Sequence, residues 1–179
     1  CYTENNEYKT ANELICNLVD IVSKNGTMLL NIGPKADGTI PNEDKNILLE
    51  IGDWLHTNGE AIYGSKVWRK AGEGPTTIEE GQFTDSKSKS FTPEDIRFTV
   101  KGSFLYATVL NYPEDGKVTI TALAEQDASK LPHFHGIIQS ITILGFDEIP
   151  KWERSSHGLK IKTTSVQSRT PVVFKIQID

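Results

Sequence analysis

The sequence predicts a short α/β segment followed by an all-β antiparallel sandwich, and three observations support this fold class. Apolar residues recur at helical spacing on both sides of one continuous apolar run between positions 10 and 59. After Trp68 the pattern changes to short strands separated by turn residues. In the last strand, residues 172–178, apolar positions alternate with others, which predicts one buried face. We therefore divide the chain into residues 1–68 and 69–179.

The first predicted helix begins after Thr10. Thr10 and Glu13 have the spacing of a capping box, in which each side chain bonds to the backbone N–H of the other residue. Asn25-Gly26 is expected to end the helix, with Gly26 in the left-handed conformation. The apolar face of this helix consists of Leu14, Ile15, Leu18, Val19 and Val22.

The Met28–Ile32 run is apolar without alternation, which predicts a strand buried on both faces. We expect a second helix with Asn42 as its N-cap and Asn58-Gly59 at its end. Its apolar face consists of Ile47, Leu48, Ile51, Trp54 and Leu55. Helix, buried strand and helix form a piece of α/β architecture that is not stable alone, because a single strand leaves both faces and both edges uncovered.

The second half of the chain contains six predicted strands. Gly102-Ser103 and Pro113–Gly116 are turn signals between neighbouring strands. The predicted strands are 96–101, 104–112, 117–123, 137–144, 159–164 and 172–178. Short strands with turn signals and no helix are typical of an antiparallel sandwich.

Composition excludes several classes of partner. The net charge is −5 and the isoelectric point is near 5.4, so we expect no nucleic acid and no anionic membrane surface as a partner. No apolar run approaches the ~20 residues that span a bilayer. The chain opens on Cys1 without an initiator Met or a signal peptide, which favours a fragment or a processed product. Cys16 lies in the helical apolar pattern and is expected to be a buried hydrophobic residue.

The segment from Leu18 to Pro41, which includes Asn25-Gly26-Thr27-Met28-Leu29-Leu30-Asn31-Ile32-Gly33-Pro34, is long and distinctive. It resembles the end of the catalytic domain of family 29 glycoside hydrolases, the α-L-fucosidases. The resemblance continues at 51–55, 58–64, 95–99, 105–107 and 143–145.

The resemblance implies that residues 1–68 are the last helix, strand and helix of a (β/α)₈-like, TIM-like catalytic barrel, and that residues 69–179 are its C-terminal sandwich. It implies exo-hydrolysis of α-L-fucosyl linkages in fucosylated glycans, with retention. The expected partners are that glycan and the missing N-terminal barrel of the same protein. No cofactor is expected, homo-oligomerisation is left open, and family members commonly work in the periplasm, outside the cell or in lysosomes.

Retaining glycosidases need two carboxylates. The resemblance implies that this Asp and Glu lie upstream of Cys1, so no catalytic residue is assigned in this chain. Asn31 ends the apolar run, near the expected barrel mouth, and is a candidate for substrate contact or for a hydrogen bond to loop backbone. Tyr2 matches an aromatic-Gly-Tyr stretch at the family's pocket rim, with Cys1 in the Gly position, and is a second candidate, against the alternative that it simply packs.

Other polar and aromatic residues are expected to be structural. Asp37 is interpreted as a turn residue, and Asp20 and Asp53 as solvated charges on helices. His133 and His135 lack the further ligands that would complete a metal site, so no metal site is predicted. Trp152 and Tyr112 are a candidate sugar-stacking platform, against the alternative that they belong to the core.

Three functional hypotheses remain: part of an α-L-fucosidase, a carbohydrate-binding sandwich, or a sandwich that stabilises the barrel. The first and third are compatible, and the front α/β segment argues against an autonomous binding module.

Overall fold

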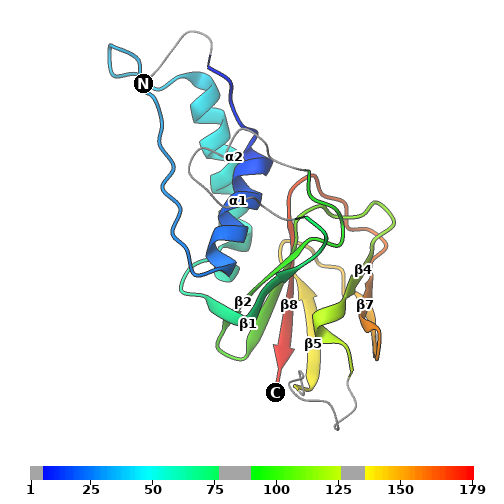
Figure 1. Cartoon of the computed structure of the whole chain (residues 1–179). Helices are drawn as coiled ribbons and strands as arrows, with labels where there is room; N and C mark the ends of the chain where they lie inside the picture. Colours follow the sequence, from blue (N-terminus) through cyan, green and yellow to red (C-terminus); the bar gives the residue numbers. More distant parts are fainter. Residues whose placement is uncertain (1–5, 77–89, 126–135) are drawn as a thin grey trace.

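A computed structural model of the chain describes residues 6–76, 90–125 and 136–179. The described residues form three layers (Figure 1): a pair of helices, a five-stranded sheet and a three-stranded sheet. The expected fold class, an α/β segment followed by an antiparallel β-sandwich, is confirmed.

The helices are α1 (Ala11–Ser23) and α2 (Asn42–Asn58), and a 3₁₀ turn, Gly59–Ala61, follows α2. The larger sheet has the order β1 (Lys66–Glu73), β2 (Ile96–Lys101), β3 (Phe104–Val109), β8 (Val172–Ile178) and β5 (Ile138–Ile143). The smaller sheet has the order β4 (Lys117–Ile120), β7 (Gly158–Lys162) and β6 (Lys151–Ser155), and a 3₁₀ turn, Thr121–Leu123, follows β4. All strand pairs are antiparallel.

Helix α1 starts as predicted and ends with a small correction. The Thr10 hydroxyl accepts from the Glu13 N–H at 3.2 Å, and the Glu13 carboxylate accepts from the Thr10 N–H at 2.8 Å, so the capping box is confirmed. At the other end Asn25, not Gly26, takes the left-handed conformation, with φ 65°. Asn tolerates this conformation, and the N–H of Gly26 closes the helix on the Ile21 carbonyl at 2.8 Å.

Helix α2 begins one residue earlier than predicted. Pro41 is its N-cap and Asn42 is already helical, without a side-chain cap hydrogen bond. Glu43 and Asp44 lie in the first turn, where negative charge is favourable next to the unpaired backbone N–H groups. The predicted end of the helix at Asn58-Gly59 is confirmed.

The predicted strand at Met28–Ile32 is wrong for this chain. Residues 26–35 run as an extended segment beside the helices without strand pairing, and a turn at 36–38 follows before α2 (Figure 1). A β-strand needs a neighbour for its N–H and C=O groups, and the described part of the chain supplies none here. Leu29 is consequently 94% exposed and Leu30 38% exposed, although they belong to the most apolar run of the sequence.

The six predicted strands of the sandwich are confirmed, with some ends shifted by a few residues. Strands β1 and β6 were not predicted. Both lie at sheet edges and carry charged residues, such as Lys66 and Glu153, which is how edges are protected from pairing with other chains. Strand β1 begins at Lys66, so it crosses the expected division at residue 68.

The central strands of the five-stranded sheet, β2 and β3, are buried on both faces, while the outer face of the edge strand β5 is exposed. The inner face of the sheet, with Phe98, Leu105 and Phe174, packs on the three-stranded sheet and forms the sandwich core. The predicted buried face of β8 is confirmed, and on the opposite face Val173 is also fully buried, beneath the helices. The second core consists of Ile15, Cys16, Val19, Trp54, Ala61, Tyr106, Leu110 and Val173.

Polar contacts also fix the helices to the sheet. Asp20 of α1 is buried, at 4% exposed, and its carboxylate accepts a hydrogen bond from the Arg97 guanidinium of β2, which is 6% exposed. Lys24 adds a second ion pair to Asp20 at 2.8 Å. The interpretation of Asp20 as a solvated charge is therefore wrong, because a helix face that meets a sheet is not solvated. Asp53, in contrast, is exposed as expected.

Replacing Asp20 tests this pair. Asp20→Ala leaves the Arg97 guanidinium buried without its carboxylate, so we expect the free energy of unfolding to fall by about 3–5 kcal/mol. Urea unfolding of the variant and of the parent chain measures the difference. The matched control is Asp53→Ala, which changes an exposed helical carboxylate and should shift stability by less than about 0.5 kcal/mol.

A double variant separates charge from packing. Asp20→Leu combined with Arg97→Met removes both charges, so it should lose less stability than Asp20→Ala. Equal losses in the two variants would contradict the role assigned to the unpaired charge.

Glu148, in the segment between β5 and β6, has a carboxylate that is held by several hydrogen bonds. Its carboxylate accepts from the Ser165 and Thr164 hydroxyls and from their backbone N–H groups, at 2.5–3.0 Å. These hydrogen bonds, those of Ser165 first, lower the pKa of Glu148 from 4.5 to about 2. A lowered pKa in the folded state means that the stabilisation is complete above pH 4.5 and is lost as pH falls toward about 2.

We therefore expect the parent chain to lose more stability over this acid range than Glu148→Gln does. Urea unfolding at a series of pH values measures both curves. Parallel curves would show that the Glu148 carboxylate contributes nothing to acid sensitivity.

Candidate functional site

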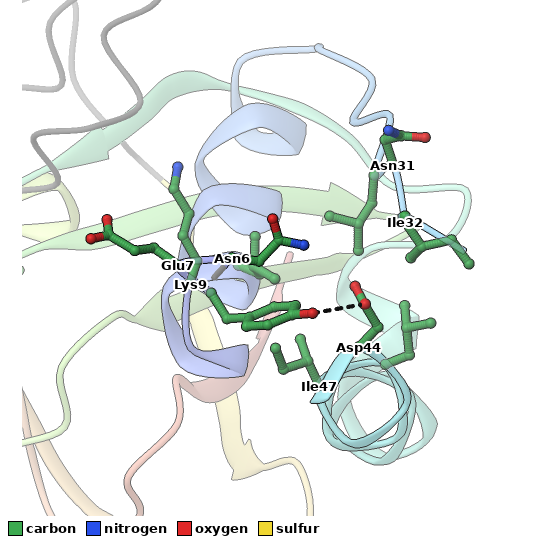
Figure 2. A pocket seen from close by; sticks show the side chains of 12 residues that line it. Asn6, Glu7, Lys9, Asn31, Ile32, Asp44 and Ile47 are labelled. Carbon is green, nitrogen blue, oxygen red and sulfur yellow. Dashed lines mark hydrogen bonds between the residues drawn. The ribbon is translucent and has the colours of Figure 1, made fainter. Parts of the chain in front are cut away.

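A pocket of about 280 Å³ lies between the segment that precedes α1, residues 30–33 of the extended segment, and the first turns of α2 (Figure 2). Three stretches distant in sequence therefore meet here. Most of the polar residues of the pocket come from the segment that precedes α1, and Leu14, Ile47 and Leu48 add apolar surface. The polar side chains are Asn6, Glu7, Tyr8, Lys9, Asn31 and Asp44.

The central contact of the pocket is a hydrogen bond from the Tyr8 hydroxyl to the Asp44 carboxylate, at 3.3 Å (Figure 2). Partial burial, together with the charge of Asp44, raises the pKa of Tyr8, so its phenol stays protonated and donates. Donors, acceptors and an apolar wall at one place can hold a polyhydroxylated ligand by hydrogen bonds and contact.

The candidate residue Asn31 lies on the wall of this pocket and is exposed. Figure 2 shows its amide turned away from Asp44, toward the outside of the pocket. The second candidate, Tyr2, lies outside the described residues, as do Cys1, His133 and His135. The structure thus places Asn31 at the edge of this pocket. Its contact with substrate remains a prediction.

Asp37 is a turn residue, as interpreted from the sequence. Its carboxylate accepts from the Thr39 N–H at 2.9 Å and from the Thr39 hydroxyl at 2.7 Å. The Thr39 hydroxyl, first, and the Thr39 N–H hold the pKa of Asp37 below its usual range. One oxygen of the Asp37 carboxylate, Oδ1, accepts both of these hydrogen bonds within the turn.

The remaining sequence candidates are structural where the structure describes them. Tyr112 is 7% exposed, belongs to the sandwich core and hydrogen-bonds Thr163 at 2.7 Å, so it forms no surface platform with Trp152, which is 38% exposed. Cys16 is buried as expected, and burial raises the pKa of its thiol to about 12, which leaves it unreactive.

Residues 6–76, 90–125 and 136–179 contain neither a metal-binding cluster nor a membrane-spanning helix. No group of three or more His, Cys, Asp or Glu side chains there is arranged to hold a metal ion. Among these same residues, no helix combines the length and the apolar character needed to cross a bilayer.

Sequence reasoning missed Tyr8 and Asp44, the hydrogen-bonded pair of the pocket. Neither belongs to a motif, and they are 36 positions apart. Only the packing of α1 against α2 brings them together, so no local pattern could have identified them.

Comparison with known proteins identifies both halves of the chain. The sequence model described as Alpha-L-fucosidase matches residues 1–60, and the model described as Alpha-L-fucosidase C-terminal domain matches residues 89–178. The chain is 37% identical to the tissue alpha-L-fucosidase of Rattus norvegicus over 141 residues, which is 79% of this chain and 25% of the rat protein. It is 52% identical to the alpha-L-fucosidase of Dictyostelium discoideum over 68 residues, 38% of this chain and 15% of that protein.

The fold is also similar to a solved structure. The crystal structure of Thermotoga maritima alpha-fucosidase superimposes with a TM-score of 0.72 and 29% identity, over 98% of this chain and 36% of that chain. The fold and the matched regions are those of glycoside hydrolases. The chain belongs to the alpha-L-fucosidase family, and residues 89–178 form its C-terminal domain. It spans about a quarter of the length of the first curated relatives.

Proposed function

We propose that this chain is the C-terminal portion of an α-L-fucosidase that hydrolyses α-L-fucosyl linkages of fucosylated glycans with retention. The observation that carries the proposal is the match of both halves to the alpha-L-fucosidase family, over about a quarter of the relatives' length. Retention needs one carboxylate as nucleophile and one as acid/base. We place both carboxylates in an upstream barrel, because no residue of this chain matches those family motifs.

The exposed apolar run supports an upstream barrel as the partner of residues 1–68. Leu29, 94% exposed, and its apolar neighbours have the composition of a parallel strand that is buried on both faces. Strands of a barrel on either side would pair the backbone of residues 28–32 and cover Leu29. In this arrangement, residues 1–68 close the barrel and residues 69–179 stabilise it from outside.

The sandwich has a structural role in this proposal. The helices cover the central part of one face of the five-stranded sheet, and only residues 62–65 separate β1 from the 3₁₀ turn after α2. Without residues 1–68 the face with Tyr106 and Val173 would be exposed to water. This two-sided burial favours a supporting domain over the alternative of an autonomous carbohydrate-binding module.

We further propose that the whole protein acts in the periplasm, outside the cell or in a lysosome. The name of one relative supports a location outside the cell: the plasma alpha-L-fucosidase of Homo sapiens is 36% identical over 114 residues, 63% of this chain and 21% of that protein.

Covalent labelling of the full-length protein tests the location of the nucleophile. A 2-fluoro-fucosyl fluoride reacts with the nucleophile of a retaining fucosidase and leaves a slowly hydrolysed glycosyl-enzyme. We expect mass spectrometry of a digest to find one labelled Asp in a peptide outside these 179 residues. The 179-residue chain alone should stay unlabelled and inactive on a nitrophenyl α-L-fucoside. A label within residues 1–179, or none on an active full-length protein, would contradict the proposal.

Substitution of Asn31 tests the candidate substrate contact in the full-length enzyme. If the Asn31 amide bonds a sugar hydroxyl, Asn31→Ala loses one hydrogen bond and kcat/KM should fall about tenfold, with little change in stability. Asn42→Ala, an exposed asparagine at the start of α2, is the matched control and should be unchanged. A loss of stability with kcat/KM intact would mean that Asn31 bonds loop backbone instead.

A further inference from the structure

The turn between α1 and the extended segment carries the triplet Asn25-Gly26-Thr27. Asn-X-Ser/Thr, with X other than Pro, is the acceptor sequence for N-linked oligosaccharides, which are attached to the Asn side chain. Of all the Asn residues in the sequence, only Asn25 is followed by Ser or Thr at the second position. The triplet therefore marks one place in the chain where this modification is chemically possible.

The structure places the whole triplet at the surface. Asn25, Gly26 and Thr27 are all exposed, and so is the preceding Lys24. The turn lies at the end of α1, at the margin of the molecule (lower left in Figure 1). A bulky oligosaccharide can be carried only at such a surface position.

The side chain of Asn25 has no structural task in the part of the chain that the structure describes. The backbone alone closes the helix here: the Asn25 N–H donates to the Val22 carbonyl at 3.0 Å, and φ of Asn25 is 65°. A Gly would adopt this left-handed conformation at lower steric cost, so the helix end does not require an amide. No described residue hydrogen-bonds the Asn25 side chain, which leaves its amide nitrogen available.

The other two positions of the triplet leave the Asn25 amide accessible. A Cβ at residue 26 would lie 2.7 Å from the Ile21 side chain, so the position favours Gly, and no side chain stands between Asn25 and Thr27. The Thr27 hydroxyl also lacks a partner among the described residues. This hydroxyl is the group that defines the acceptor sequence, and here it has no competing contact.

The turn is remote from the candidate pocket. Helix α1 has 13 residues, and at 1.5 Å per residue it separates the turn by about 20 Å from the segment before α1 that lines the pocket. In a barrel, turns from helix to strand lie at the face opposite the active site. An oligosaccharide on Asn25 would therefore leave the pocket open.

We propose that Asn25 is an N-glycosylation site. Asn25 Nδ2 forms a bond to the first sugar of an oligosaccharide that is carried on a lipid diphosphate. The bond from this sugar to the diphosphate breaks, Nδ2 loses one proton, and the lipid diphosphate leaves. The transfer takes place on the side of the membrane away from the cytosol, so the proposal rests on the location proposed above for the whole protein.

The test is mass spectrometry of tryptic peptides from the full-length protein, both purified from the organism that makes it and secreted by cultured animal cells. Cleavage after Lys24 and Lys35 gives one peptide, residues 25–35. We expect this peptide to carry the mass of N-acetylhexosamine and hexose units. Peptide N-glycosidase should remove these units and leave Asp at position 25.

Variants secreted by the same cells separate the modification from the fold. Thr27→Ala should abolish the added mass while it keeps Asn25 in the turn, and Thr27→Ser, which retains the hydroxyl, should keep it. Asn42→Gln, at an exposed Asn outside any acceptor sequence, is the matched control and should be glycosylated as the parent is. Because the turn is remote from the pocket, Thr27→Ala should hydrolyse a nitrophenyl α-L-fucoside with unchanged kcat/KM.

An unmodified 25–35 peptide from either source would overturn the proposal, as would added mass that Thr27→Ala retains. The fucosidase function is measured separately by hydrolysis of the fucoside. An active protein with an unmodified peptide would refute only the glycosylation site, whereas a glycosylated but inactive protein would refute only the proposed function.

Discussion

Burial of the central strands of the five-stranded sheet, β2 and β3, on both faces is the constraint on which the rest of the structure depends. The inner face is covered by the second sheet, and the outer face, with Tyr106 and Val173, is covered by α1 and α2. The Asp20–Arg97 pair lies within this outer interface and fixes one helix to one strand. A charge pair removed from water stabilises only when both partners are present, so it specifies this arrangement of the layers.

The helical layer has a different environment on its other side. Helices α1 and α2 bury residues such as Ile15 and Trp54 against the sheet, while Leu29 of the segment between them remains exposed. Buried positions and exposed apolar positions thus lie within one short stretch of chain. An upstream barrel would explain both, because the same stretch would then lie between two partners, the sandwich and the rest of the barrel.

The residues of the pocket differ in what the sequence reveals about them. Asn31 was a candidate because it ends an apolar run, a local feature that a sequence displays. The Tyr8–Asp44 pair has no local signature, since its two residues are 36 positions apart in the chain. Asp20 was interpreted as a solvated charge from its residue type alone. That interpretation is wrong because a carboxylate on a helix is solvated only when nothing packs on that face of the helix.

The sequence by itself determined the helices, the hairpins and six of the strands, because capping residues, turn residues and apolar periodicity act over a few neighbouring positions. It also carried the family resemblance, in the run from Leu18 to Pro41. Tertiary structure alone decided the charged edge strands β1 and β6, the burial of Val173, and the unpaired state of Met28–Ile32. Each of these depends on which surface lies opposite, and a strand exists only where a second strand pairs with it.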